Sequence, residues 1–270
     1  MRIALLGGGV IARLLLQHLH RDARGESQVI AIAGRADGSG ARSLAAEFGV
    51  PFVVGADALV RARPNVVVEA ASHDAVREHV ERLLSSGIAV IVLSGGALVD
   101  DELRQRLERA AAQGARLYVP SGGIGGLDAV KAACAAGVEE VGIAIAKPPR
   151  AWKNIPFVQR LGVDLDALTA PLTLFDGTAR EGVPHFPANV NIAAVLALAG
   201  AGFDRTRLTV IADPALRFNT HSIGVKGRTG TIDLRFQNVP SPDNPRTAML
   251  ACYSALAAVR ELSAPVRYGT

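Results

Sequence analysis

The residues Arg2–Leu19, RIALLGGGVIARLLLQHL, place a short apolar run ahead of three glycines and a helical pattern. This order predicts a strand, a tight turn and a helix. Gly7, Gly9 and Ala12 have the G-x-G-x-x-G/A spacing of a dinucleotide-binding turn. Gly7 permits the turn, Gly9 has no Cβ to hold a pyrophosphate away, and Ala12 lets the helix pack closely on the strand. The amides at the helix N-terminus would then face the phosphates.

Short apolar runs alternate with helical patterns through the first 120 residues. Continuous runs of valine and isoleucine predict strands that are buried on both faces, and hence a parallel sheet covered by helices. This alternation is typical of a Rossmann-type, doubly wound α/β domain, in which ligands bind at the carboxyl ends of the strands. The expected strands are residues 2–6, 29–33, 51–54, 65–70, 89–93 and 117–119, and further helices are expected at 39–48, 74–86 and 100–113.

The pattern changes after Pro120, where a glycine-rich joint precedes a helix at 127–136 and scattered strand-like runs. A mixed, mostly antiparallel sheet with few helices is typical of an α+β substrate or dimerisation domain. The very apolar last helix, from 246 to about 262, is expected to return to the first domain. We therefore expect a dinucleotide-binding domain of residues 1–121 plus 240–270 and a second domain of 122–239. The strand-like runs are residues 139–146, 172–175, 208–211, 222–226 and 231–236.

Composition narrows the functional classes. The net charge is +4, but the arginines are scattered and aromatic residues are only 4% of the chain, which argues against a nucleic-acid partner. No apolar segment reaches the roughly 18 residues that a membrane span needs, and we expect no leader sequence. Cys134 and Cys252 are far apart in alanine-rich patterns, so we expect reduced thiols in a cytoplasmic protein and no metal site.

The end of the second expected strand indicates the form of the dinucleotide. An acidic residue there usually holds the ribose 2′-hydroxyl of NAD, whereas a basic residue accommodates the 2′-phosphate of NADP. Arg35 stands at this strand end, and Asp37 follows two residues later. We therefore expect NADP to be accepted, with NAD as an alternative, although an arginine in a solvated loop would look the same.

Several polar stretches in the second half stand where a scaffold alone does not need them. The turn Ser121–Asp128 offers backbone amides to an anion such as a substrate carboxylate. Lys147 ends a strand, Asn189 and Asn191 precede an alanine-rich helix, and His221 follows a polar turn. Each has an ordinary structural alternative, since Asn189 would also serve as a helix cap and most histidines are not catalysts. Spacing alone leaves these alternatives open.

Taken in order along the chain, these motifs resemble the L-aspartate dehydrogenase family. The sequence departs from the family pattern at Ala12 and Gly123, where glycine and alanine are common, and both changes exchange one small residue for another. The matching residues are Gly7-x-Gly9-x-Ile11, Glu69-Ala70-Ala71-Ser72-His73, Ser94-Gly95-Gly96-Ala97-Leu98, Ser121–Asp128, Lys147-Pro148, Phe175-Asp176-Gly177, Asn189-Val190-Asn191, Ala212-Asp213-Pro214, Asn219-Thr220-His221 and Asn244-Pro245-Arg246-Thr247.

The resemblance implies oxidation of L-aspartate to iminoaspartate with NAD or NADP, a step that feeds NAD biosynthesis. It implies that His221 is the active-site residue, and we expect His221 to take the ammonium proton or to orient a water molecule. Lys147, Asn189 and Ser121 are the expected partners of the substrate carboxylates. The expected cofactor-binding residues are Gly7, Gly9, Val10, Ile11, Arg35, Ala70, His73, Ser94, Gly123 and Asn191.

Three alternatives remain open at this level. The chain could be another two-domain NAD(P)-dependent dehydrogenase or reductase, such as a dihydrodipicolinate reductase or a homoserine dehydrogenase. It could be a non-catalytic nucleotide sensor, which would need neither His221 nor the two asparagines. The enzyme could also work mainly in reverse, using oxaloacetate and ammonia. An exposed antiparallel sheet in the second domain favours a homodimer.

Overall fold

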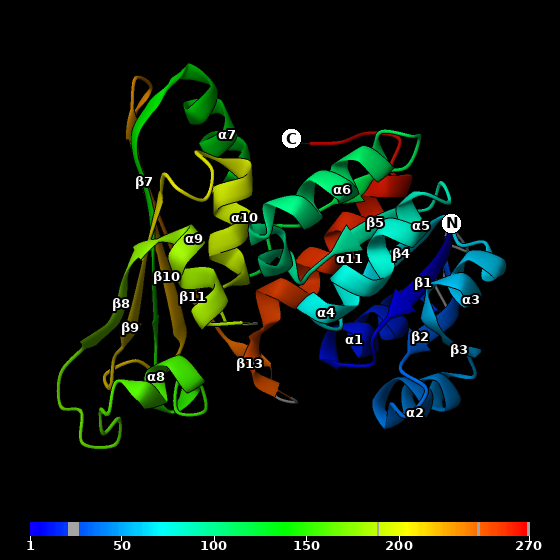
Figure 1. Ribbon diagram of the computed structural model, residues 1–270, viewed down its shortest axis with the longest axis horizontal. Helices are drawn as coiled ribbons and strands as arrows, with labels where there is room; N and C mark the ends of the chain where they lie inside the picture. The colour runs from blue at the N-terminus through cyan, green and yellow to red at the C-terminus, as the bar shows by residue number, and fades with distance from the viewer. Residues whose placement is uncertain (21–26, 188, 242–243, 269–270) are drawn as a thin grey trace. The chain divides into compact units, whose positions relative to one another are not determined.

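The structure is a computed structural model that describes residues 1–20, 27–187, 189–241 and 244–268 (Figure 1). The chain forms two compact units, one of Met1–Pro120 with Ala251–Tyr268 and the other of Ser121–Leu250. The sequence boundaries put residues 240–250 in the first domain, whereas these residues belong to the second unit. The reason is local, because strands β12 (Pro240–Ser241) and β13 (Asn244–Ala248) pair with each other directly after the last strand of the second sheet.

The first unit contains a six-stranded sheet in the order β3-β2-β1-β4-β5-β6, in which every pair is parallel. The doubly wound α/β prediction is confirmed. The strand order reverses between β1 and β4, and in such sheets the ligand binds at the carboxyl ends of the strands near this reversal. The strands are β1 (Arg2–Leu6), β2 (Gln28–Gly34), β3 (Phe52–Val54), β4 (Val66–Glu69), β5 (Ala89–Val92) and β6 (Leu117–Tyr118).

Helices fill the connections between these strands. The expected helix at 74–86 is interrupted, because Val76–Val80 form a π-helical segment between α4 and α5. Helix α3 was not expected from the sequence, and its short core-facing side consists of Ala56 and Leu59. The helices are α1 (Val10–Leu19), α2 (Ser39–Phe48), α3 (Gly55–Ala62), α4 (His73–Ala75), α5 (Glu81–Leu84), α6 (Asp101–Ala111) and a 3₁₀ turn at Gly95–Val99.

The last helix, α11 (Met249–Ser263), completes the core of the first unit. It begins three residues later than expected, since 244–248 are a strand. Its buried residues Cys252, Ala255, Leu256 and Val259 join the cluster formed by β1, α1 and β2. Removal of this apolar surface from water is the main contribution that α11 makes to stability. The expected return of the C-terminal helix to the first domain is therefore confirmed.

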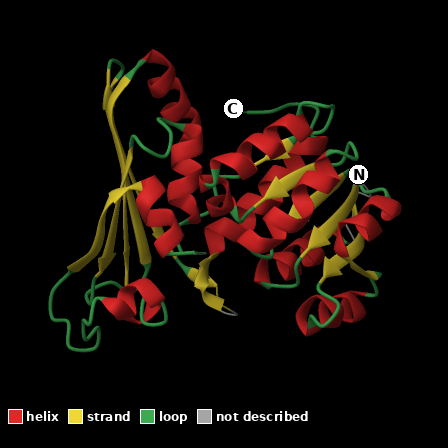
Figure 2. Cartoon of the chain, in the orientation of Figure 1, coloured by secondary structure: helices red, strands yellow, loops and turns green. Residues whose placement is uncertain are grey.

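The second unit contains a five-stranded sheet in the order β11-β10-β7-β9-β8. Strands β7 and β9 are parallel and the other three pairs are antiparallel, which confirms the expected mixed, mostly antiparallel sheet. Figure 2 shows α7, α9 and α10 together along one side of this sheet. The elements are α7 (Leu127–Ala136), β7 (Val138–Lys147), α8 (Pro156–Arg160), β8 (Leu172–Thr178), α9 (Ala179–Gly182), α10 (Asn191–Ala199), β9 (Thr206–Ala212), β10 (Asn219–Gly227) and β11 (Gly230–Asn238).

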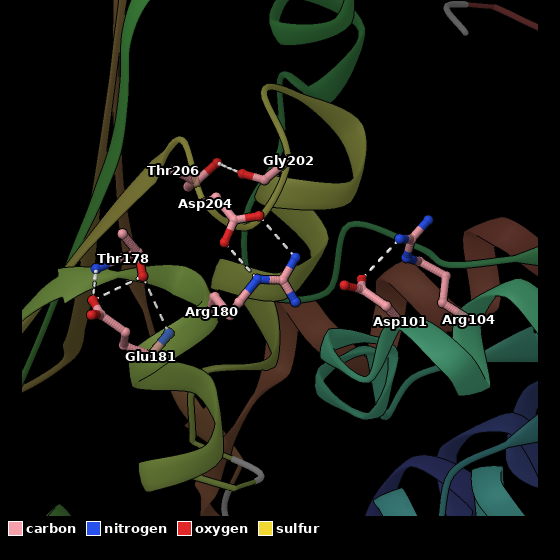
Figure 3. A network of polar contacts seen from close by, with 8 residues as sticks. All are labelled: Asp101, Arg104, Thr178, Arg180, Glu181, Gly202, Asp204 and Thr206. Carbon is pink, nitrogen blue, oxygen red and sulfur yellow. Dashed lines mark hydrogen bonds and ion pairs between the residues drawn. The ribbon is translucent and has the colours of Figure 1, made fainter.

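The short helix α9 is fixed by polar contacts at its start (Figure 3). The Thr178 hydroxyl accepts the Glu181 amide at 3.2 Å, and the Glu181 carboxylate accepts the Thr178 amide at 2.9 Å. This reciprocal capping box satisfies donors that a helix N-terminus otherwise leaves unpaired. The Arg180 guanidinium also donates to the Asp204 carboxylate through two nitrogens, which links α9 to the segment before β9.

None of the described helices is long and apolar enough to span a bilayer.

Candidate active site

The glycine turn after β1 has the geometry that its sequence predicts. Gly7 has a φ of +115°, a conformation that residues with a Cβ rarely adopt, and its amide donates to the Ala33 carbonyl at 2.9 Å. A Cβ at Gly7 would lie 2.5 Å from the Ala70 carbonyl oxygen. Glycine is therefore required here by both conformation and space. The close approach also places the Ala70 backbone at the turn.

Gly9 has a different role from Gly7. It precedes α1 as its N-cap with a φ of −85°, and no described side chain caps that helix end. An added Cβ at Gly9 would meet no described atom within 4 Å. This open space lies beside the N-terminus of α1, whose first residues are Val10 and Ile11. It fits a bound pyrophosphate, because the amides at a helix N-terminus are available to an anion. Ala12 is fully buried, as close packing on the sheet requires.

A buried carboxylate joins the carboxyl ends of β4 and β5. Glu69 accepts the Ala71 amide at 2.8 Å, the Ser94 amide at 3.0 Å and the Ser94 hydroxyl at 2.9 Å. Burial raises the pKa of Glu69, and these hydrogen bonds oppose the rise. Sequence reasoning treated Glu69 as part of a motif without a role, although an acidic residue ending a valine run was a signal. Ser94, an expected cofactor residue, donates to this carboxylate, and His73 lies half-buried at the start of α4.

The end of β2 presents two arginines. Arg35 is 88% exposed, and its Nε lies 3.8 Å from the Asp37 carboxylate. Arg42 on α2 lies with its guanidinium carbon 4.3 Å from the centre of the Phe52 ring, and it donates to the Ala36 carbonyl at 3.1 Å. Sequence reasoning identified Arg35 and missed Arg42, because α2 brings the second arginine back to the strand end.

His221 lies on β10 between two strands, opposite Ile145 of β7 and Phe236 of β11. It is 4% exposed. Its Nδ1 lies 3.0 Å from the Asn238 amide nitrogen and 3.2 Å from the Gly123 carbonyl oxygen. Its Nε2 is buried and has no hydrogen-bond partner among the described residues. The side chain is therefore held at one ring nitrogen and left unpaired at the other.

Burial is the main reason that the pKa of His221 falls from 6.5 to about 4. The positive charge of Lys147 lowers this pKa further, and the Gly123 carbonyl opposes the change. His221 is consequently a neutral imidazole near neutral pH. This is the protonation state of a hydrogen-bonding partner or of a base, and not that of a fixed positive charge.

Lys147 ends β7 on the same face as His221, two residues beyond Ile145. It is 4% exposed, and its ammonium donates to the Asn189 carbonyl at 3.0 Å. The nitrogen lies 4.9 Å from the centre of the Trp152 ring. Burial lowers the pKa of Lys147 from 10.5 to about 8. No acidic side chain of the described chain pairs with Lys147. A ligand carboxylate could therefore form an ion pair with this partly dehydrated ammonium.

Asn189 does not cap α10. Its side-chain amide donates to the Pro187 carbonyl at 3.3 Å, while the N-cap position belongs to Val190 and the helix begins at Asn191. The capping alternative for Asn189 is therefore wrong. Its backbone carbonyl instead receives the Lys147 ammonium. This hydrogen bond connects the end of β7 to the loop that precedes α10.

The sheet register gathers further polar side chains at the same end. Asn219 of β10 stands opposite Asn238 of β11, and both are buried although they are polar. Side chains two residues apart on a strand share a face, so these asparagines share the face of His221. Sequence reasoning included Asn219 only within a motif and did not single out Asn238. The sequence does not indicate that Asn238 is buried, because a polar residue at the end of an alternating strand is usually exposed.

The turn before α7 lies next to this cluster through Gly123. A Cβ on Gly123 would lie 3.4 Å from the Asn238 amide nitrogen and 3.5 Å from His221 Cε1, which are ordinary contacts. Gly122 and Gly126 both have positive φ values. Asp128 stands in the first turn of α7, and its negative charge reduces the attraction of that helix N-terminus for an anion. Ser121 lies half-buried at the start of the turn.

Two family models match the chain. Residues 128–262, half of the chain, match the model described as "Aspartate dehydrogenase, C-terminal". Residues 7–120 match the model described as "Homoserine dehydrogenase, NAD binding domain". The second model covers the doubly wound sheet and its glycine turn. The first covers the region that contains His221, Lys147 and Asn238.

Relatives and a solved structure agree with these matches. The chain is 39% identical to L-aspartate dehydrogenase of Methanocella arvoryzae, covering 100% of this chain and 99% of that protein. It is 45% identical to L-aspartate dehydrogenase of Methanosarcina mazei, covering 76% of each. The crystal structure of aspartate dehydrogenase from Thermotoga maritima superposes with a TM-score of 0.75 at 28% identity, covering 100% of this chain and 99% of that one. Together with the polar cluster around His221, these similarities establish that the chain belongs to the aspartate dehydrogenase family.

Proposed function

We propose that this protein oxidises L-aspartate to iminoaspartate with NAD or NADP, and that it aminates oxaloacetate reductively in the opposite direction. The observation that supports this most directly is the pairing of a buried, neutral His221 with a buried Lys147 at one end of the second sheet. This cluster falls within the region that matches the aspartate dehydrogenase model. A sensor that only bound the nucleotide would have no need to bury an unpaired cation.

The glycine turn fits the cofactor. In this proposal the first amides of α1, at Val10 and Ile11, hold the pyrophosphate beside Gly9, where the chain leaves open space. The nicotinamide ring of the bound dinucleotide supplies the acceptor for the hydride that leaves the substrate. The other expected cofactor residues retained in the proposal are Gly7, Arg35, Ala70, His73, Gly123 and Asn191, whereas the Ser94 hydroxyl donates to Glu69.

Lys147 binds one carboxylate of the dicarboxylate substrate in this proposal. Its ammonium is dehydrated by burial and is held in place by the Asn189 carbonyl at 3.0 Å. An anion that pairs with it offsets the cost of burying the charge. Asn189 therefore contributes by positioning Lys147 through its backbone, and Ser121 remains a candidate for contact with the second carboxylate.

Hydride leaves the substrate Cα only after the ammonium has lost a proton, because the nitrogen lone pair stabilises the developing C=N bond. His221 contacts the substrate as a neutral ring through Nε2, the nitrogen that has no partner in the described chain. Such contact positions the substrate and its charge during the transfer. The released proton passes to solvent, and the products are iminoaspartate, the reduced nicotinamide and that proton.

We also propose that two copies of the chain form a homodimer through the sheet face opposite α7 and α10. This face contains the small residues Gly142, Ala144, Ser222 and Gly224 around a hollow of about 750 Å³. Charges of both signs surround the hollow, which suits self-complementary pairing about a two-fold axis. They are Glu139, Glu140, Arg205, Arg207, Lys226 and Asp233. A Gly224→Arg variant should elute from size exclusion at half the mass of the unmodified protein.

A cytoplasmic location is part of the same proposal. It is supported by Cys134 and Cys252, which are both free thiols, as expected in a reducing compartment.

The decisive experiment follows the absorbance of the reduced nicotinamide with L-aspartate, L-glutamate, L-malate and homoserine, and with oxaloacetate plus ammonia. We expect turnover with L-aspartate far above the others and with both dinucleotides. The His221→Ala variant should lose at least about 100-fold in kcat/KM, because it removes the hydrogen bond that positions the substrate and its charge during the transfer. His79→Ala, a histidine of the first unit, is the matched control and should keep activity. Absence of turnover with aspartate and with oxaloacetate plus ammonia would overturn the proposal.

A further inference from the structure

Three polar atoms meet at the Nδ1 edge of the His221 ring: Nδ1 itself, the Asn238 amide nitrogen and the Gly123 carbonyl oxygen. The Asn238 amide nitrogen donates to the Gly123 carbonyl at 2.7 Å and lies 3.0 Å from His221 Nδ1, and Nδ1 lies 3.2 Å from the same carbonyl. All three groups are buried. We propose that Asn238 is a positioning residue that fixes the tautomer of His221. The neutral ring then has its proton on Nε2, and this N–H donates a hydrogen bond to a carboxylate oxygen of the substrate. This inference rests on the proposed function for the identity of the substrate.

The orientation of the Asn238 amide follows from Gly123. A carbonyl oxygen only accepts hydrogen bonds, so the group 2.7 Å from it must be the NH₂ of Asn238. The reversed amide would place two oxygens at that separation. Since the NH₂ group has two protons, the second is available for the neighbouring ring nitrogen.

The protonation of Nδ1 follows in turn. With Nδ1 unprotonated, the Asn238 NH₂ donates to the Gly123 oxygen at 2.7 Å and to the ring at 3.0 Å, and the one unmatched contact, between Nδ1 and the Gly123 oxygen, is the longest of the three at 3.2 Å. With a proton on Nδ1, two N–H donors would lie 3.0 Å apart, and the hydrogen bond from the ring to Gly123 would be the longer contact of 3.2 Å. The first arrangement satisfies the three groups better.

Nε2 is then a donor with no acceptor. It is buried and unpaired among the described residues, which is unfavourable for a polar group. The ammonium of Lys147 is the charged group that acts on the ring. A substrate carboxylate suits both, because it accepts from Nε2–H and neutralises the ammonium. In this arrangement His221 holds the substrate, and it is not the base that removes the ammonium proton.

The tautomer can be measured directly in the whole enzyme by nitrogen NMR of ¹⁵N-histidine-labelled protein at neutral pH. We expect the His221 Nδ1 signal to be of the unprotonated type and the Nε2 signal to be of the N–H type. This measurement needs no variant, so it does not depend on whether a substitution folds. A protonated Nδ1 in the unmodified enzyme would overturn the inference, whatever the activity.

Substitution of Asn238 extends the test. In Asn238→Ala the Gly123 carbonyl is the remaining partner of Nδ1, so the proton should move to Nδ1, and kcat with aspartate should fall about tenfold or more. The KM for the dinucleotide should stay unchanged. Asn154→Ala, at an exposed asparagine, is the control and should keep both tautomer and kcat. Full activity of Asn238→Ala with an unchanged tautomer would exclude the role. An inactive unmodified enzyme with the expected tautomer would instead remove the proposed function alone.

Discussion

Ser94 donates both its amide and its hydroxyl to the buried carboxylate of Glu69, and this contact holds the ends of β4 and β5 together. The sequence motif suggests that Ser94 binds the cofactor. The structure indicates a different role, since the Ser94 hydroxyl donates a hydrogen bond to Glu69. Glu69 in turn depends on Ser94, because a buried carboxylate needs its hydrogen-bond donors to offset the loss of water.

We predict that Ser94→Ala destabilises the fold more than it weakens cofactor binding. The substitution removes one donor from a buried carboxylate, which costs about 1–3 kcal/mol. The free energy of unfolding in urea should fall by that amount, and the KM for the dinucleotide should change little. Ser85→Ala, an exposed serine of the same unit, is the control. A large rise in KM with unchanged stability would return Ser94 to direct cofactor binding.

Gly7 and Gly9 form a matched pair for separating folding from binding. Gly7→Ala forces a Cβ to within 2.5 Å of the Ala70 oxygen at a positive φ, so it should cost at least about 2 kcal/mol of stability. Gly9→Ala meets open space at an ordinary φ and should change stability by only about 0.5 kcal/mol. It should nevertheless weaken dinucleotide binding, because its methyl group occupies the approach to the α1 amides.

The measurements for this pair are urea unfolding and titration of intrinsic fluorescence with NAD and NADP. Equal loss of stability in both variants would contradict the distinct roles of the two glycines. Unaltered dinucleotide binding by Gly9→Ala would argue against a pyrophosphate at this turn.

Much of the first unit could be predicted from the sequence because its strands are uninterrupted apolar runs. Strand β4 reads as three valines in a row, and the glycine turn fixes which helix follows β1. Helix α3 was missed because only Ala56 and Leu59 of its eight residues face the core, too few to produce a clear period. The start of α11 was misplaced because pairing with β12, a tertiary contact, makes 244–248 a strand.

The site divides in the same way. His221, Lys147 and the glycine turn belong to local motifs and could be found in the sequence. Asn238 could not, because its role depends on the register of β10 with β11 and on a carbonyl 115 residues away. The lowered pKa values of His221 and Lys147 likewise arise from burial, which no local pattern specifies.

The buried ammonium of Lys147 predicts a pH-dependent stability. Its pKa is about 8 in the folded chain and 10.5 when exposed, so between these values the unfolded chain binds a proton that the folded chain does not. Stability therefore rises with pH across this window, and the cost of the buried charge is present in full below pH 8. The shift corresponds to about 3 kcal/mol at most.

Lys147→Met should abolish this dependence while preserving volume. Urea unfolding of the unmodified protein and the variant should differ by an amount that changes across the window from 8 to 10.5. Taking the difference cancels the titration of other groups. Lys131→Met, at an exposed lysine of α7, is the control and should give no such change. Parallel curves for the unmodified protein and Lys147→Met would show that the lysine is not buried as a cation.

The two arginines at the end of β2 predict how the enzyme chooses its dinucleotide. Arg35→Ala should raise the KM for NADP about tenfold, since a charge-assisted contact with the 2′-phosphate is lost at an exposed position. The KM for NAD should stay the same or fall, because the neighbouring Asp37 is released to meet a ribose hydroxyl. Arg42→Ala should act in the same direction with an added small loss of stability, since Arg42 also packs on Phe52. Arg61→Ala on α3 is the control, and steady-state kinetics with both dinucleotides is the measurement. An equal change for NAD and NADP would indicate that these arginines affect the loop and not the 2′-phosphate.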